Sequence, residues 1–177
     1  MEPEELISSE TRFAGRLLRL RVDTVRLPGG QVSRREVVEH PGAVAVLPVL
    51  PSGELVLVRQ YRHAVGRALL EVPAGTRQPA ESPEACARRE LLEETGFEAG
   101  TLRELARFYV SPGWANEELI VYLATGLVAR QPQPADDERI AVERVAPERV
   151  SELVQKRDIA DAKTLVAVLG YLGLHLV

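Results

Sequence analysis

The chain has 177 residues, 45% hydrophobic and 27% charged, a balance typical of a folded globular protein. Its 22 basic and 26 acidic residues give a net charge of -4, which argues against a dedicated nucleic-acid-binding protein. The single cysteine excludes an intrachain disulfide framework and a cysteine-rich zinc site. The sequence has no apolar stretch long enough to span a membrane, and its acidic start is unlike a secretory leader, so we expect a cytoplasmic protein.

The first part of the chain is predicted to form strands. Alternating stretches on both sides of Pro28-Gly29-Gly30 predict a β-hairpin. Residues 43–50 and 55–61 predict a second strand pair joined by a Pro-Ser-Gly turn, and residues 69–72 predict a short strand. We therefore divide the chain into an N-terminal strand extension over residues 1–40 and a main domain over residues 41–177.

A helix is predicted next, because capping residues mark both of its ends. Ser82 is a favourable N-cap, Pro83 suits the first helical position, and Gly96 suits the position just after a helix. Strands mixed irregularly with few helices indicate an α+β fold or a mixed sheet flanked by helices, and not a regular βαβ alternation. The later strands are predicted at residues 102–109, 119–124 and 140–145, and the last two helices near residues 147–155 and 162–172.

The predicted helix carries three glutamates on one face. Glu90, Glu93 and Glu94 lie within an arc of about 100°. Their mutual repulsion destabilises a helix unless positive charge offsets it, and carboxylate oxygens are ligands that suit Mg²⁺ or Mn²⁺. Arg89 precedes Glu93 by one helical turn and can orient that carboxylate through a charge-assisted hydrogen bond. Taken alone, the pattern is equally compatible with a solvated acidic face.

A longer motif surrounds this helix. Gly75, Glu81 and the run Arg89-Glu90-Leu91-Leu92-Glu93-Glu94-Thr95-Gly96-Phe97 have the spacing of the Nudix box, with every fixed position filled. The chain therefore resembles the Nudix hydrolases. The resemblance implies a mixed β-sheet sandwiched between helices, and hydrolysis of a nucleoside diphosphate linked to another moiety.

The resemblance also implies a metal site. It implies that Glu90 and Glu94 are the principal ligands, that Glu93 is a shared ligand or assists catalysis, and that the carbonyl of Ala74 is a further ligand. Mg²⁺ is the expected cofactor, with Mn²⁺ or Zn²⁺ as alternatives. The residues implied to hold the motif in shape are Gly75, Glu81, Arg89 and Gly96.

Other stretches resemble the ADP-ribose pyrophosphatase subgroup. They are the Ser-Pro-Gly segment at residues 111–113 and residues 59–62, 70–75 and 161–165. An ordinary turn is the alternative for the Ser-Pro-Gly segment. This resemblance implies cleavage of ADP-ribose to AMP and ribose 5-phosphate. Arg62 is a candidate for phosphate contact, because a planar guanidinium binds phosphate through two hydrogen bonds; an ordinary surface arginine is the alternative. The residues expected to bind substrate are Arg62, Glu71, Pro112 and Gly113.

Two acidic residues outside the helix are candidates for catalysis. Glu138 lies in a polar loop that matches the mobile acidic loop supplying a catalytic glutamate in related enzymes, and we expect it to be the general base. Its neighbours Asp136 and Asp137 leave the assignment open by one or two positions. Glu117 follows the Ser-Pro-Gly turn and is expected to position a metal or water. A solvated-loop role is the alternative for each acid.

The subgroup resemblance implies a homodimer in which N-terminal strands are exchanged between subunits, since a lone hairpin is marginally stable. The expected binding partner is a small nucleotide-sugar substrate, and we expect no binding to nucleic acid or to a membrane.

One alternative to ADP-ribose cleavage is hydrolysis of another nucleotide sugar such as GDP-mannose. A regulator that binds ADP-ribose without cleaving it is a second alternative, which the intact box argues against.

Overall fold

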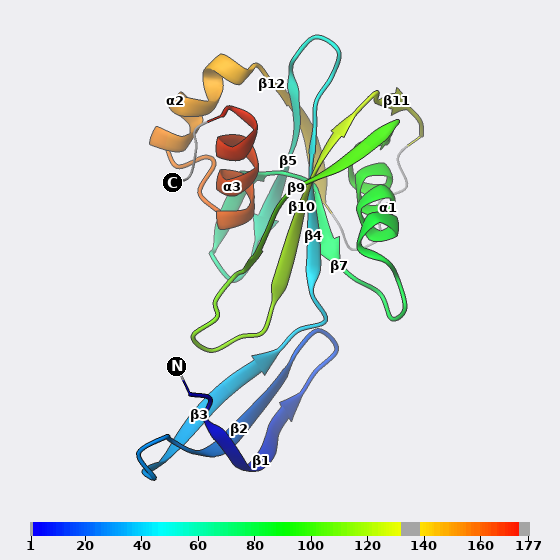
Figure 1. The fold of residues 1–177 in the computed structure, drawn as a ribbon. Helices are drawn as coiled ribbons and strands as arrows, with labels where there is room; N and C mark the ends of the chain where they lie inside the picture. The colour runs from blue at the N-terminus through cyan, green and yellow to red at the C-terminus, as the bar shows by residue number, and fades with distance from the viewer. Residues whose placement is uncertain (1, 132–138, 174–177) are drawn as a thin grey trace. The chain divides into compact units, whose positions relative to one another are not determined.

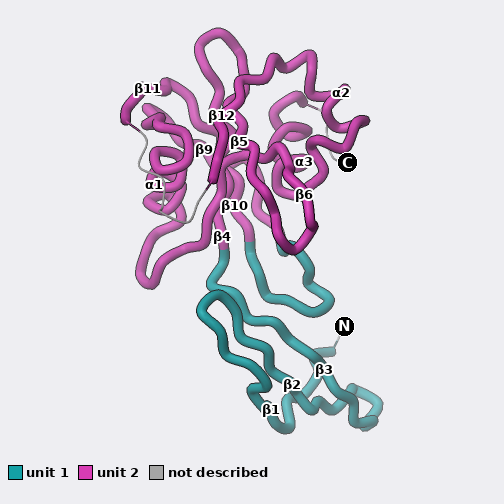
Figure 2. Tube along the Cα trace, turned by 180° about the vertical axis from the view of Figure 1, so that it is seen from behind, with its two compact units in different colours: residues 1–42, 109–118 teal, residues 43–108, 119–177 magenta. Residues whose placement is uncertain are grey.

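The structure is a computed structural model that describes residues 2–131 and 139–173. It divides into two compact units, shown in Figure 2. Unit 1 comprises Met1–Gly42 and Tyr109–Glu118, and unit 2 comprises Ala43–Phe108 and Leu119–Val177.

Unit 1 is built on a three-stranded antiparallel sheet in the order β1-β2-β3. The predicted hairpin is present as β2 (Arg19–Arg26) and β3 (Val32–Glu39). The turn between them needs a glycine at position 30, where φ is 84°. β1 (Glu5–Ala14) was not predicted, because its polar run has no apolar alternation and all ten of its residues are exposed. It is held by backbone pairing with β2.

Unit 2 contains two main sheets and a short ribbon. The four-stranded sheet has the order β7-β4-β10-β9, and the three-stranded sheet has the order β12-β5-β6. The first is mixed, since β4 pairs in parallel with β10 and antiparallel with β7. The strands are β4 (Ala43–Pro48), β5 (Leu55–Arg62), β6 (Arg67–Glu71), β7 (Ala74–Thr76), β8 (Phe97–Glu98), β9 (Thr101–Tyr109), β10 (Glu118–Thr125), β11 (Val128–Ala129) and β12 (Ile140–Val145).

The predicted pairing of the strands at residues 43–50 and 55–61 is wrong. Both strands exist as β4 and β5, but they belong to different sheets and share only the single bridge Val49↔Leu55. The Pro-Ser-Gly turn reverses the chain without starting a ladder. β4 is buried along its whole length, and such a strand is typical of the parallel interior of a sheet.

Helices cover both faces of the mixed sheet, as predicted for the fold. α1 (Pro83–Thr95) lies on one side, and α2 (Val150–Gln155) and α3 (Ala162–Tyr171) lie on the other (Figure 1). Alternate residues of β4 supply the two cores. Val44 and Val46 pack in the cluster that contains Leu91 of α1. Ala45 belongs to the cluster that contains Val168 of α3, so one strand anchors both layers.

The ends of α1 are where the sequence predicts them. The Ser82 side chain accepts a hydrogen bond from Ala85 N at 3.2 Å, and Pro83 begins the helix. Gly96 ends it with a left-handed φ of 71°. The helix predicted near residues 147–155 is a 3-10 turn (Pro147–Arg149) followed by α2. Within the described residues, no helix is both long and apolar enough to cross a membrane.

Candidate functional site

The acidic face of α1 packs against β7. Glu90 and Glu94 are 7% and 5% exposed, whereas Glu93 is half-buried. Glu94 Oε2 accepts a hydrogen bond from Ala74 N at 3.2 Å. A Cβ at position 75 would lie 2.0 Å from Glu90 Oε1, so only glycine allows this carboxylate to approach the strand. The box thus brings its helix and its glycine turn into direct contact.

Arg89 holds this acidic face together. Its Nε and Nη2 donate to the two carboxylate oxygens of Glu81 at 2.8 and 2.9 Å. Its Nη1 donates to Glu90 Oε1 at 2.6 Å and to Glu93 Oε2 at 3.0 Å. One guanidinium therefore offsets the repulsion among three carboxylates and fixes their orientation.

Glu81 is the carboxylate most affected by this arrangement. Hydrogen bonds from Arg89 lower the pKa of Glu81 to about 2, with a further contribution from the backbone N–H of Gln78. Glu81 therefore stays ionised well below its ordinary range. It ties the loop before α1 to the arginine that orients the other two glutamates.

Cys86 has a packing role in the same helix. Burial, together with the neighbouring Glu81, raises the pKa of the Cys86 thiol to about 12. The thiol therefore stays protonated at neutral pH, which does not suit a nucleophile. Its sulfur lies 3.3 Å from Arg89 Nη2 and 3.7 Å from the Thr76 carbonyl oxygen.

The predicted substrate residues Arg62 and Glu71 contact each other. Arg62 Nε and Nη2 donate to Glu71 at 3.0 and 2.6 Å, and Lys163 of α3 donates to the same carboxylate. Burial raises the pKa of Glu71, but the two cations outweigh it, and the pKa is lowered overall. Sequence reasoning assigned no role to Lys163, although it lies in one of the stretches that resemble the subgroup.

The remaining predicted residues belong to unit 1 or lie outside the described residues. Pro112 and Gly113 form an exposed turn of unit 1, and Glu117 Oε1 lies 3.8 Å from His40 Nδ1 in the same unit. Glu138, with Asp136 and Asp137, lies outside the described residues. The site described for unit 2 consists of Arg62, Glu71, Ala74, Gly75, Glu81, Arg89, Glu90, Glu93, Glu94, Gly96 and Lys163.

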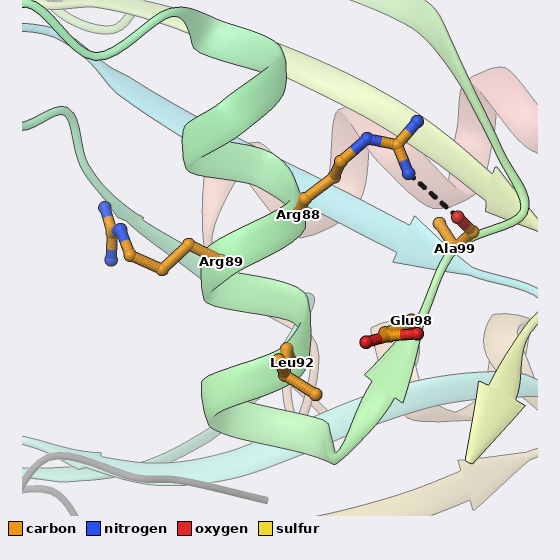
Figure 3. Close-up of a pocket in the computed structure, with 5 residues that line it drawn as sticks. All are labelled: Arg88, Arg89, Leu92, Glu98 and Ala99. Carbon is orange, nitrogen blue, oxygen red and sulfur yellow. Dashed lines mark hydrogen bonds between the residues drawn. The ribbon is translucent and has the colours of Figure 1, made fainter. Parts of the chain in front are cut away.

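A pocket of about 380 Å³ lies beside α1 (Figure 3). Arg88 and Arg89 are adjacent in sequence but project from the helix in different directions, and Arg88 Nη1 donates to the Ala99 carbonyl at 2.8 Å. The residues lining the pocket do not include Glu90 or Glu94. The pocket therefore marks the flank of the helix and not its acidic face. Its lining residues are Arg88, Arg89, Leu92, Glu98 and Ala99.

Comparison with known proteins identifies the family. Residues 38–168 match the NUDIX domain, and residues 4–38 match the nucleoside diphosphate sugar hydrolase N-terminal domain. The chain belongs to the NUDIX family. This Nudix hydrolase is 43% identical over 167 residues to an ADP-ribose pyrophosphatase of Bacillus subtilis (strain 168), covering 93% of this chain and 90% of that protein.

Two further proteins extend the comparison. A GDP-mannose pyrophosphatase of Enterobacter sp. (strain 638) is 34% identical over 156 residues, covering 81% of the Nudix chain and 80% of the relative. The crystal structure of an ADP compounds hydrolase superposes with a TM-score of 0.87 at 22% identity, covering 98% of this chain and 95% of that one. The latter shows that the fold is shared.

Nudix hydrolases generally depend on divalent metal ions, and the residues present fit such an ion. The donors on α1 are carboxylate oxygens, which suit a hard cation, and the absence of a Cβ at Gly75 lets the Glu90 carboxylate approach the strand. No group of three closely placed His, Cys, Asp or Glu side chains forms a ready-made metal centre within the described ranges. Arg89 instead occupies the position between Glu90 and Glu93.

Proposed function

We propose that this Nudix enzyme hydrolyses the pyrophosphate of ADP-ribose, giving AMP and ribose 5-phosphate, with Mg²⁺ as the cofactor. The observation that carries the chemistry is the buried pair Glu90 and Glu94 facing the backbone at Ala74 and Gly75. The similarity to an ADP-ribose pyrophosphatase over nearly the whole of both chains supports the substrate. The match of residues 4–38 to a nucleoside diphosphate sugar hydrolase segment supports the same substrate class.

In this proposal the chain's residues have separate tasks. Glu90, Glu94 and the carbonyl of Ala74 would hold the cation. When bound, the cation neutralises pyrophosphate charge and lowers the pKa of the attacking water. Arg89 fixes the direction of the carboxylates, and the more exposed Glu93 is available to orient water or share the ion. Arg62 would bind a phosphate oxygen.

The general base remains a prediction from the sequence. Glu138 is expected to accept the proton of the attacking water, and Glu117 is expected to position that water or a metal. Exchange of Glu138 for Gln removes the base at nearly constant size, so the rate at saturating substrate is expected to fall by about a hundredfold or more. A Glu138→Gln rate within about twofold of wild type would refute the assignment.

The proposal includes a homodimer with exchanged N-terminal strands and a cytoplasmic location. The fully exposed β1 supports the dimer, because a small sheet with an uncovered strand gains stability by packing against another surface. The expected substrate, a cellular nucleotide sugar, supports the location.

Product analysis tests the proposed activity. The purified protein with Mg²⁺ is given ADP-ribose, GDP-mannose, an oxidised deoxynucleoside triphosphate and a diadenosine polyphosphate. AMP and ribose 5-phosphate should form fastest from ADP-ribose, and Glu90→Gln should abolish the reaction. The matched control is Glu84→Gln on the exposed first turn of the same helix, which should retain wild-type turnover.

The alternative activities predict other outcomes. Faster turnover of GDP-mannose would replace the proposed substrate while keeping the acidic helix as the site, and the GDP-mannose pyrophosphatase relative favours this second candidate. Tight ADP-ribose binding without turnover of any compound would indicate a regulator.

A further inference from the structure

A second charged cluster lies beside the acidic helix, and it is centred on a buried carboxylate. Glu71 ends β6 with 1% of its surface exposed. Arg62 of β5 donates to it through Nε at 3.0 Å and Nη2 at 2.6 Å. Lys163 Nζ donates to the same Oε2 from α3. Two cations from different elements thus share one buried anion.

Lys163 is held in place from its own side as well. Asp161 Oδ1 accepts from Lys163 Nζ at 2.8 Å and caps α3 by accepting from Thr164 N at 3.1 Å. Thr164 Oγ1 in turn accepts from Val72 N at 3.0 Å, directly after Glu71. The Lys163 side chain is 15% exposed. Its ammonium group is therefore fixed between a strand end and a helix start.

The orientation of Arg62 leaves one end of its guanidinium available. The edge formed by Nε and Nη2 is occupied by Glu71, while Nη1 makes no hydrogen bond within the described part of the chain. The side chain is 37% exposed. Hydrogen bonding to Glu71 is the main reason that the pKa of Arg62 is raised, and the charge of Glu94 adds to the effect. Ala74, three residues after Glu71, donates to Glu94 Oε2 at 3.2 Å, so the cluster that holds Arg62 adjoins the acidic face of α1.

We propose that Lys163 is a positioning residue that fixes Glu71, and through it Arg62, so that Arg62 Nη1 is directed at the substrate pyrophosphate. The inference rests on the proposed function. The charges of Arg62 and Lys163 balance those of Glu71 and Asp161. Loss of the Lys163 ammonium group removes one of the two restraints on Glu71, so this carboxylate no longer holds the Arg62 guanidinium in one direction. Substrate binding, more than the chemical step, therefore depends on Lys163.

Steady-state kinetics of paired variants test this inference. Lys163→Gln and Lys163→Arg are measured in the wild-type protein and in an Arg62→Ala background. The control is Lys156→Gln, which removes the only other lysine, an exposed residue bound to Glu152 on α2. We expect Lys163→Gln to raise KM about tenfold with kcat within about threefold, and Lys163→Arg to restore most of the loss. In the Arg62→Ala background Lys163→Gln should cause no further rise, because its effect passes through Arg62.

Two results would overturn the inference: an unchanged KM in Lys163→Gln, or an equal rise in the Arg62→Ala background. If Lys163→Gln does not fold, Lys163→Arg takes its place. Its smaller rise in KM is then compared between the wild-type protein and the Arg62→Ala background. Wild-type turnover separates the two proposals. If the wild-type protein hydrolyses GDP-mannose and not ADP-ribose, the proposed substrate is wrong. The role of Lys163 is then tested by measuring the KM of the same variants for GDP-mannose. If neither compound is hydrolysed, the dissociation constant of ADP-ribose measured by calorimetry replaces KM.

Discussion

Arg89 determines how three carboxylates can share a small volume. It gives two of its N–H donors to Glu81 and divides a third nitrogen between Glu90 and Glu93. A lysine in the same position would supply the charge but not the planar, multiply directed set of donors. The residue therefore acts on the geometry of the site as much as on its charge.

A pH-dependent stability follows from the contact between Arg89 and Glu81. The pKa of Glu81 is about 2 in the folded protein and 4.5 in its ordinary state, so its stabilising contribution is present above pH 4.5 and is lost as the pH falls to about 2. In urea unfolding with EDTA, the stability difference between wild type and Arg89→Gln should be largest above pH 4.5 and shrink below it. The control, Arg88→Gln, should show a weaker pH dependence, since Arg88 binds Glu84 instead. A constant difference for Arg89→Gln would contradict the assignment.

Substitution of Gly75 tests whether activity requires the close contact between β7 and the Glu90 carboxylate of α1. A methyl group there would overlap the Glu90 carboxylate, so Gly75→Ala must displace that side chain. A ligand shifted by about 1 Å costs on the order of a hundredfold in rate, and we expect a loss of kcat of this size with folding retained. Gly29→Ala is the matched control, because a Cβ at Gly29 meets nothing within 4 Å. Wild-type kcat in Gly75→Ala would show that Glu90 is not needed in this position.

The site residues were predictable from sequence to different degrees. The glutamates of α1 share one helix, so their common face follows from helical spacing alone. The contact of Glu71 with Lys163 joins residues 92 positions apart, and it depends on where α3 packs. Periodicity carries no information on such a contact. The one signal in the sequence that could have drawn attention to Lys163 is that the chain has only two lysines.

At the scale of elements, α1 is the best determined part of the molecule because its limits are set locally. Ser82 and Gly96 satisfy backbone groups at its two ends. The strand partners were harder to predict, since β4 pairs with a strand more than seventy residues away instead of with the next strand in sequence. β1 had no sequence signal because its residues bury no apolar face.

Substitution of Ser82, the N-cap of α1, is expected to lower the stability of the protein without lowering its activity. Ser82→Ala removes the hydrogen bond to Ala85 N, and we expect a loss of about 1 kcal/mol in the free energy of unfolding. The glutamates lie toward the other end of the helix, so kcat/KM should stay within about twofold of wild type. Urea titration and steady-state kinetics measure the two quantities. Ser151→Ala, at an exposed position of α2, should leave both unchanged.

At the scale of the whole molecule, the two units differ in how well they are covered. Unit 2 has helices on both faces of its mixed sheet, and its core strands are buried. Unit 1 exposes all of β1, including Leu6 and Phe13, which are 55% and 56% exposed. Such a small sheet is the part of the chain most in need of a further packing surface.

The proposed homodimer can be measured directly. Light scattering at micromolar concentration should give twice the chain mass of 19.5 kDa. Leu6→Ser combined with Phe13→Ser should shift the protein toward the monomer, because apolar contact area is lost. Val65→Ser is the control, since Val65 is 58% exposed on unit 2. A wild-type protein with the mass of a single chain would contradict the dimer.

The segment from Glu71 to Gly75 joins the two charged clusters, and its backbone is bonded to three different elements. Val72 N donates to Thr164, Pro73 O accepts from Val46 N, and Ala74 N donates to Glu94. The amide proton of Ala74 is thus an internal reporter. Any cation that draws Glu94 away would expose this proton to exchange with solvent, so occupancy of the site becomes visible to NMR at one backbone position, without substrate or turnover.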